Sequence, residues 1–536
     1  MAKKRRPLSP DEPLRHPDHP RPISRREFVR QGFIGGSAVV TGGSALLNML
    51  LARNAQAALS QDIKDLADAS GCPVDFSGAG KIPFICFDLA GGANLAGSNV
   101  LVGGPLGQED PLSTQGYSKL GIQGDRVPTS ATFINSSLGL KFHSESALLA
   151  GIMSNVTSAT AANTNGFVIP ARSDNDTSNN PHNPMYGIAK YGGRGQLLNL
   201  IGSVASDSGG NSMAVADLID LTFRPTKISR PSDASGLVDT GNLTAILGQA
   251  DAINVMESSV RISDAQLGKL GLDSATRKLL DCGYLGAVDN VNKISGPDDL
   301  NPVKDDLILN NLFQGLSSGS GTGVNSDAEF LKTASVMKLV VNGYAAAGTI
   351  TMGGFDYHTG DRTTGEQRDL RAGRCIGACL EYARLRNKPL MIYVFSDGSL
   401  FSNGMADGSG NITTSDGITI PGGKGVWTGD NSSTACSFAL VYNPTKPLTV
   451  LTNNQIGNFK TTGDVNTAAR TANGNPIVGA NNVTSLAYTV LLNYMALHGE
   501  QSDFYTTFPT ANLGGTPLDE LVVFDKIVNG VITSPA

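Results

Sequence analysis

A continuous apolar run at Leu390–Phe395, closed by Ser396 and Asp397, is the feature that most restricts the fold. Such a run is typical of a strand buried on both faces of a sheet. A helix is predicted ahead of it, from about 365 to 386, and Thr349–Met352 predicts a strand ahead of that helix. Strand, loop, helix and strand in this order imply a right-handed crossover between two parallel strands. The chain is therefore expected to adopt an α/β fold.

Further apolar runs extend this sheet. Ile82–Leu89 predicts a buried strand that ends at Gly91 and Gly92. We expect one domain over residues 58–536, with a mostly parallel central sheet flanked by helices, long loops and a mainly helical insertion over about 205–347. The other predicted strands are Leu148–Met153, Ser437–Tyr442 and Leu448–Leu451.

Polar residues lie at the ends of three of the predicted strands: Asp88, Asp356 with His358, and Asp397. The carboxyl ends of parallel strands meet in one crevice, so these side chains are candidates for a common site. Asp356 and His358 are two residues apart, which places both side chains on the same side of an extended segment. Carboxylate oxygens with an imidazole suit a divalent metal such as zinc, manganese or magnesium. The alternative is that each acid forms a turn or caps a helix.

Two short motifs resemble a known family. Gly-Gly-Phe-Asp-Tyr-His at Gly353–His358 is followed by a helix and then by Val-Phe-Ser-Asp-Gly at Val394–Gly398. This order is similar to an uncharacterised, twin-arginine-exported bacterial family of the alkaline phosphatase/sulfatase superfamily. The family also has a strand followed by Gly-Gly, which Asp88–Asn94 resembles, and a polar motif that residues 179–183 resemble. The resemblance runs in order from Pro83 to His498 and implies an alkaline-phosphatase-like fold.

The resemblance also implies a chemistry. In the superfamily two metals polarise a phosphate or sulfate ester, and a Ser, Thr or modified Cys attacks it. By analogy Asp356, His358 and Asp397 would hold metal and Asp88 would complete or bridge the site, while no residue is identified as the nucleophile. Additional candidates on the same analogy are Asn94, His182, Asn183, Ser396 and Asp430.

The chain departs from the family pattern in three places. Asp397-Gly398 lacks the usual Gly-Arg ending, Ala93-Asn94 stands where Asn-Asp is usual, and Asp430-Asn431 stands where the family has Asp-His. Two functions therefore stay open. One is a metal-dependent hydrolase of phosphate or sulfate esters, and the other is a non-catalytic binding or assembly protein of the periplasm or cell envelope.

An arginine-rich helix face offers a second kind of site. Arg362, Arg368, Arg371 and Arg374 follow the Asp356 motif, within or just ahead of the predicted helix 365–386. They form either an anion clamp or a solvated helix face.

The N-terminal segment predicts export. Ser24–Val29, with Arg25 and Arg26, resembles a twin-arginine signal, and Ala55-Gln56-Ala57 offers a cleavage site. Residues 1–57 are thus expected to be a signal peptide recognised by the twin-arginine translocase. The apolar run 33–51 contains four glycines and is short for a stable membrane span. The mature protein is expected to be periplasmic or extracellular and not membrane-spanning.

The net charge of the mature part bears on its binding partners, and its cysteines bear on its redox compartment. Residues 1–57 hold ten of the 41 Lys and Arg and four of the 47 Asp and Glu, so the mature part has a net charge of −12. Such an acidic protein is a poor partner for nucleic acid. Its six cysteines include no C-x-x-C pair, and a disulfide of unknown pairing is compatible with an oxidising compartment. Cys375 and Cys379 are expected to be buried thiols on one helix face.

Overall fold

The computed structural model describes residues 59–70, 80–129, 131–173, 180–238, 249–294, 297–314, 327–360, 362–530 and 532. The chain divides into a smaller helical unit, made of Met1–Asp75 and Ser235–Asp299, and a larger sheet unit, made of Phe76–Ala234 and Leu300–Ala536. The expected export signal, with Arg25 and Arg26, lies outside the described residues.

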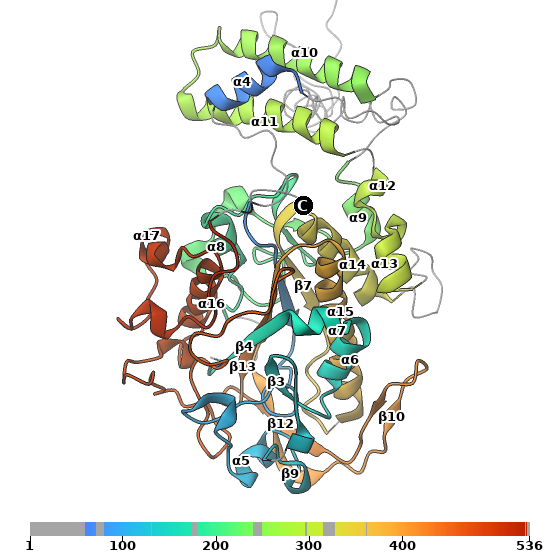
Figure 1. Cartoon of the computed structure of the whole chain (residues 1–536), viewed down its shortest axis with the longest axis vertical. Coiled ribbons are helices and arrows are strands. Elements are labelled where there is room, and N and C mark those ends of the chain that lie inside the picture. The colour runs from blue at the N-terminus through green and yellow to red at the C-terminus, as the bar shows by residue number, and fades with distance from the viewer. Residues whose placement is uncertain are drawn as a thin grey trace, which may run out of the picture. The chain divides into compact units, whose positions relative to one another are not determined.

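A seven-stranded sheet forms the centre of the sheet unit (Figure 1). Strand β1 pairs in parallel with both β7 and β8, and β5 pairs in parallel with β6 and β7. Strand β13 is antiparallel to its neighbours β8 and β4. The prediction of an α/β fold with a mostly parallel central sheet is therefore confirmed. In spatial order the strands are β4 (Thr164–Pro170), β13 (Cys436–Tyr442), β8 (Leu390–Ser396), β1 (Phe84–Leu89), β7 (Ala345–Met352), β5 (Leu198–Gly202) and β6 (Thr226–Lys227).

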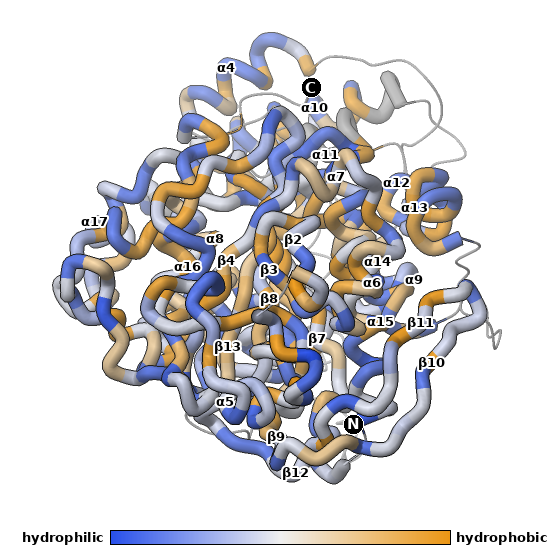
Figure 2. Tube along the Cα trace, turned by 60° about the horizontal axis from the view of Figure 1, so that its bottom comes forward, coloured by the Kyte–Doolittle hydropathy of each residue, from blue (hydrophilic) through white to orange (hydrophobic). Residues whose placement is uncertain are grey.

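Helices cover both faces of this sheet, which explains why its central strands are mostly apolar. Every residue of β1, β7 and β8 is buried. Figure 1 shows α8 and α16 on one side of the sheet and α14, α15 and α6 on the other. In Figure 2 the hydrophobic residues of the sheet unit gather along these central strands, and the loops around them are more hydrophilic. The covering helices are α6 (Ala147–Asn155), α8 (Met185–Lys190), α14 (Ala328–Val341), α15 (Arg362–Leu385) and α16 (Val483–Leu497).

Short elements complete the sheet unit. Among the residues that the structure describes, three two-stranded sheets lie outside the central one, and the pair of β9 and β12 is the one that contributes to the site below. These pairs are β2 (Ile134–Leu138) with β3 (Leu140–His143), β9 (Ser399–Ala406) with β12 (Gly425–Asn431), and β10 (Ile412–Thr413) with β11 (Thr419–Ile420). The short helices are α5 (Thr114–Lys119), α7 (Ser158–Ala162), α9 (Pro231–Ser235), α12 (Pro297–Leu300), α13 (Asp306–Asn311) and α17 (Phe504–Thr507).

Two predicted strands are wrong. Leu148–Met153 lies within helix α6, whose first turn is capped by Ser146. The helix is apolar on most sides because it crosses α15 closely, and a Cβ on Gly151 would lie 2.1 Å from the Leu370 carbonyl oxygen. Leu448–Leu451 contributes only an isolated bridge between Val450 and Phe524. A buried helix and a buried strand share the same short apolar signal, so the run alone does not separate them.

The helical unit is shorter than the expected insertion at 205–347. Helices α4 (Gln61–Ser70), α10 (Gln249–Leu267) and α11 (Ser274–Lys293) form it, whereas residues 205–234 and 300–347 belong to the sheet unit. Ion pairs connect its helices: Arg261 of α10 pairs with Asp62 of α4, and Arg277 of α11 pairs with Asp264 of α10. The helical unit is thus assembled from two segments that lie far apart in the sequence, one with α4 and one with α10 and α11.

Cysteine chemistry differs between the two units. Cys282, on α11 of the helical unit, is disulfide-bonded. The free thiols among the described residues are buried, which confirms the expectation for Cys375 and Cys379; they are Cys86, Cys375, Cys379 and Cys436. None of the helices in the described part of the chain combines the length and apolarity that a membrane crossing requires.

Candidate metal centre

The candidate site lies at the carboxyl ends of the central parallel strands. The turn after β1 passes between the segments that follow β7 and β8. A Cβ on Gly91 would lie 2.6 Å from the Asp356 backbone nitrogen, and one on Gly92 would lie 3.4 Å from the Asp397 carbonyl oxygen. Both glycines also have positive φ, 120° and 97°. Only glycine satisfies both the close approach and the backbone conformation at Gly91.

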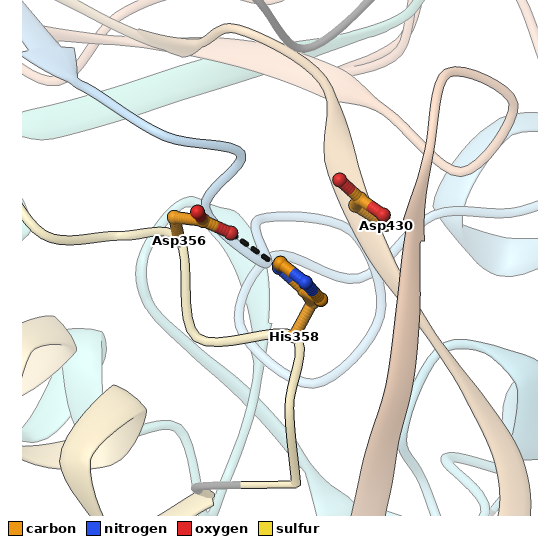
Figure 3. A group of neighbouring side chains, drawn as sticks. All are labelled: Asp356, His358 and Asp430. Carbon is orange, nitrogen blue, oxygen red and sulfur yellow. Dashed lines mark hydrogen bonds and ion pairs between the residues drawn. The ribbon is translucent and has the colours of Figure 1, made fainter.

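Three side chains converge at this edge: Asp356, His358 and Asp430. One potential ligand atom from each lies within 4.8 Å of the other two. His358 Nδ1 and Asp356 Oδ1 form an ion pair or hydrogen bond, depending on the protonation of the ring. Figure 3 shows the three side chains reaching towards one another from two segments. Asp356 and His358 follow β7, whereas Asp430 belongs to β12, where it pairs with Leu400 of β9.

Tyr357 fixes the direction of its two neighbours. Side chains alternate along an extended segment, so Tyr357 faces inward while Asp356 and His358 face outward. Its side chain is only 3% exposed. The Tyr357 hydroxyl accepts a hydrogen bond from the Asn94 backbone N–H at 3.2 Å and donates one to Asp369 Oδ1 at 3.2 Å. Asn94, a predicted site residue, therefore contributes through its backbone, and its side chain bonds to Ser98 Oγ.

A buried network of charged groups lies beneath Tyr357. Burial, followed by the negative charge of Glu366, raises the pKa of Asp369 to about 7. Burial would also raise the pKa of Glu366, but the cations Lys424 and Arg362 outweigh it and hold that pKa below its ordinary value. The Arg362 guanidinium lies 4.5 Å from the Trp427 ring centre, which connects α15 to β12, the strand of Asp430. The network thus supports both segments of the site.

Asp88 does not join the three converging side chains. It is fully buried, and its carboxylate accepts hydrogen bonds from the Asn211 and Ser212 backbone N–H groups at 2.7 and 2.9 Å. The Ser212 and Thr351 hydroxyls donate to it as well. Burial raises the pKa of Asp88, although these hydrogen bonds oppose the increase. Asp88 is the fifth residue of six-residue β1, so its carboxylate connects the strand to the 211–212 segment instead of reaching the edge.

Asp397 and His182 form a separate buried cluster. Asp397 is fully buried and accepts a hydrogen bond from the Asn180 side chain. The His182 ring stacks on Phe395 at 5.6 Å, and its Nε2 lies 3.2 Å from Ser173 Oγ. Burial lowers the pKa of His182 to about 3, so the ring is neutral. We predicted that Asp397 would lie beside Asp356 and His358, but the residue that the structure brings next to these two side chains is Asp430.

Ser396 and Asn183 stabilise the backbone around the site. The Ser396 hydroxyl donates to the Leu89 carbonyl at 2.5 Å and accepts from the Ala93 N–H at 2.6 Å, which ties β8 to the turn after β1. Asn183 Oδ1 accepts from the Met185 N–H at 3.0 Å, in the first turn of α8. Both polar side chains are thus engaged in supporting the strand ends.

The converging donors fit a divalent cation. Two carboxylates and one imidazole are a donor set that zinc, manganese and magnesium accept, and three donors leave positions open for water or substrate. Ligand bonds of about 2.1 Å around a tetrahedral ion place the donor atoms about 3.4 Å apart. The observed separations of up to 4.8 Å therefore need to close by about 1.4 Å at most. Asp356, with 58% of its side chain exposed, has room for this rotation.

Comparison with known proteins adds no assignment. A scan against protein-family models found no match, and a search of curated proteins found no similar sequence.

Proposed function

We propose that this chain is an exported, metal-dependent hydrolase of phosphate or sulfate esters with an alkaline-phosphatase-like arrangement of its sheet. The convergence of Asp356, His358 and Asp430 from two separate segments carries this proposal. The short motifs of the resemblance support it too, because two of these residues belong to one motif and Asp430 to another.

The three side chains would hold a divalent cation, which would supply Lewis-acid polarisation of the ester oxygens. The Ser396 hydroxyl is engaged with Leu89 and Ala93, so we expect water to be the attacking group. Attack forms a new bond to phosphorus or sulfur, the ester bond breaks, and one proton of the water ends on the leaving alcohol.

Two observations support export to an oxidising compartment. The twin-arginine motif at Arg25 and Arg26 is one, and the disulfide at Cys282 is the other. Disulfides persist in the periplasm and outside the cell, whereas the cytosol keeps thiols reduced. We therefore propose that the mature protein works in the periplasm or outside the cell, after transport by the twin-arginine translocase.

A non-catalytic binding or assembly protein is the second candidate. The burial of Asp397 and His182 in a separate cluster favours it, because these residues would otherwise supply further ligands. Three donors are sufficient for one ion but leave little for a second.

Metal content and turnover of the exported protein test both candidates. We expect purified protein to bind Mn²⁺ or Zn²⁺ with a stoichiometry of about one and to hydrolyse p-nitrophenyl phosphate or sulfate only when metal is present. Asp356→Asn and Asp430→Asn should each lower metal affinity at least about tenfold and abolish turnover. Asp519→Asn, at an exposed acid, is the matched control and should change neither.

The outcomes separate the two candidates. Metal binding that depends on Asp356 and Asp430, without turnover of either ester, supports the binding protein. A wild-type protein that binds neither Mn²⁺ nor Zn²⁺ refutes the metal centre and the hydrolase with it.

A further inference from the structure

The four arginines from Arg362 to Arg374 on α15 have different environments. Three form ion pairs, which neutralise their charge: Arg362 with Glu366 at 2.8 Å, Arg371 with Asp327 at 3.4 Å and Arg374 with Asp416 at 2.6 Å. Arg368 is half-buried, and no described residue forms a hydrogen bond or an ion pair with its guanidinium. It is therefore the one arginine of this set whose charge is not balanced within the described structure.

The Arg368 guanidinium lies flat against the loop that carries Asp356. Gly354 has a φ of +87°, and a Cβ there would lie 2.8, 3.0 and 3.1 Å from Cζ, Nη1 and Nη2 of Arg368. These nearly equal distances mean that Gly354 faces the flat side of the guanidinium. The N–H groups around its rim therefore point sideways and remain available to an acceptor.

Charge balance shows what kind of acceptor this site favours. Asp356 and Asp430 together carry two negative charges, which a divalent cation would balance while His358 is neutral. The Arg368 guanidinium, on α15, lies beside Gly354, which is two residues away from Asp356 in its loop. Its charge then leaves the site with one positive charge. Guanidinium groups bind phosphate and sulfate through two parallel hydrogen bonds, so such an anion matches both the charge and the shape of Arg368.

We propose that Arg368 is the residue that recognises the anionic group of the substrate, and that the site accepts a phosphate or sulfate monoester in preference to a neutral ester. This inference rests on the proposed function, which it makes more specific. Arg368 would bind two non-bridging oxygens of the ester, and a cation held by Asp356, His358 and Asp430 would supply Lewis-acid polarisation of the same group.

Anion binding by metal-loaded protein tests the role of Arg368. Inorganic phosphate and sulfate are titrated by calorimetry into Mn²⁺-loaded wild type, Arg368→Gln, Arg368→Lys and Arg371→Gln. We expect Arg368→Gln to weaken anion binding at least about tenfold, as for loss of a charge-assisted pair, while Mn²⁺ affinity stays the same or increases. Arg368→Lys should recover part of the affinity because it keeps the charge without the fork. Arg371→Gln is the matched control on the same helix and should behave as wild type.

Each result decides the inference. Wild-type anion affinity in Arg368→Gln overturns it, even where Mn²⁺ binds. If wild type binds no Mn²⁺, the proposed function fails, and the same titration on metal-free protein decides the role of Arg368. Anion binding that depends on Arg368 then supports it, and no anion binding by wild type overturns it. Should Arg368→Gln not fold, Arg368→Lys gives the answer, since a bidentate contact predicts weaker binding and wild-type affinity contradicts it.

Discussion

Replacing Asp369 by asparagine should remove a pH dependence of stability that is built into the buried network. The folded-state pKa of Asp369 is about 7, against an ordinary value of 3.8. Because the folded protein holds the proton more tightly, it binds more protons than the unfolded chain between these two values. The free energy of unfolding therefore falls as the pH rises from about 4 to about 7 and changes little from this cause outside that window.

The magnitude follows from the shift. One proton released on unfolding corresponds to about 1.4 kcal/mol for each pH unit. Between about pH 5 and about pH 7.5 the contribution of Asp369 amounts to about 2 to 3 kcal/mol, because the last half unit lies above its pKa. Asp369→Asn keeps an oxygen for the Tyr357 hydroxyl but turns an amide N–H₂ towards the Asn99 donor, 2.9 Å away in the wild type. Losing that bond costs about 1 to 3 kcal/mol at every pH.

The assay is urea denaturation followed by the fluorescence of Trp427, which is the single tryptophan and lies 2% exposed beneath Arg362. Wild type and Asp369→Asn are compared at several pH values with a chelator present, so that metal binding does not contribute. As the pH rises from about 5 to about 7.5, the free energy of unfolding of the variant minus that of wild type should increase by about 2 to 3 kcal/mol, because only wild type loses this contribution. A constant difference between the two proteins over this range would show that Asp369 does not titrate as argued, and Asp519→Asn provides the control for surface charge.

Two further changes test how the loop after β7 is held. Tyr357→Phe keeps the ring and removes the hydroxyl that joins Asn94 to Asp369. We expect Mn²⁺ affinity, measured by calorimetry, to fall a few-fold and the free energy of unfolding to fall by about 1 kcal/mol. Unchanged affinity would mean that the hydroxyl does not position the ligands. Gly91→Ala places a Cβ 2.6 Å from the Asp356 nitrogen at a positive φ and should lower both Mn²⁺ affinity and thermal stability. Gly353→Ala, where a Cβ would have no neighbour within 4 Å, is its control, and equal effects of the two changes would contradict the close-packing argument.

The sequence predicted the centre of the sheet but not its borders. Strands β1, β7 and β8 are buried on both faces, so their residues are mostly apolar and lack the regular alternation of apolar and polar residues that marks a strand with one exposed face. The antiparallel direction of β13 was not predicted, because pairing direction depends on where the long connection before it returns to the sheet. The same limit explains α6, whose helical state depends on packing against α15 through small residues.

The candidate site shows a similar division. Asp356 and His358 were predicted together because their spacing of two places them on one side of an extended segment. Asp430 was only an additional candidate, since it reaches the site on β12, a strand of a different sheet. Asp88 and Asp397 were predicted from their positions at strand ends. However, Asp88 lies inside β1 and Asp397 follows β8 directly, so both remain in the buried layer. Asp356 comes four residues after the end of β7 and therefore reaches the surface.

The exposure of the metal-binding side chains offers a way to distinguish a hydrolase from a binding protein. Asp356 is largely exposed, so its free rotation must be lost when a cation binds. Fixing the ligand side chains in one geometry costs side-chain entropy. The scaffold lowers this cost only where it holds the backbone, which it does at Tyr357 for one segment and at the Arg362–Trp427 contact for the other. A catalyst needs its donors held close to the working geometry, whereas a binding protein tolerates looser donors. Weakening the scaffold while leaving the three ligands intact should therefore reduce turnover more than metal affinity if the chain is a hydrolase.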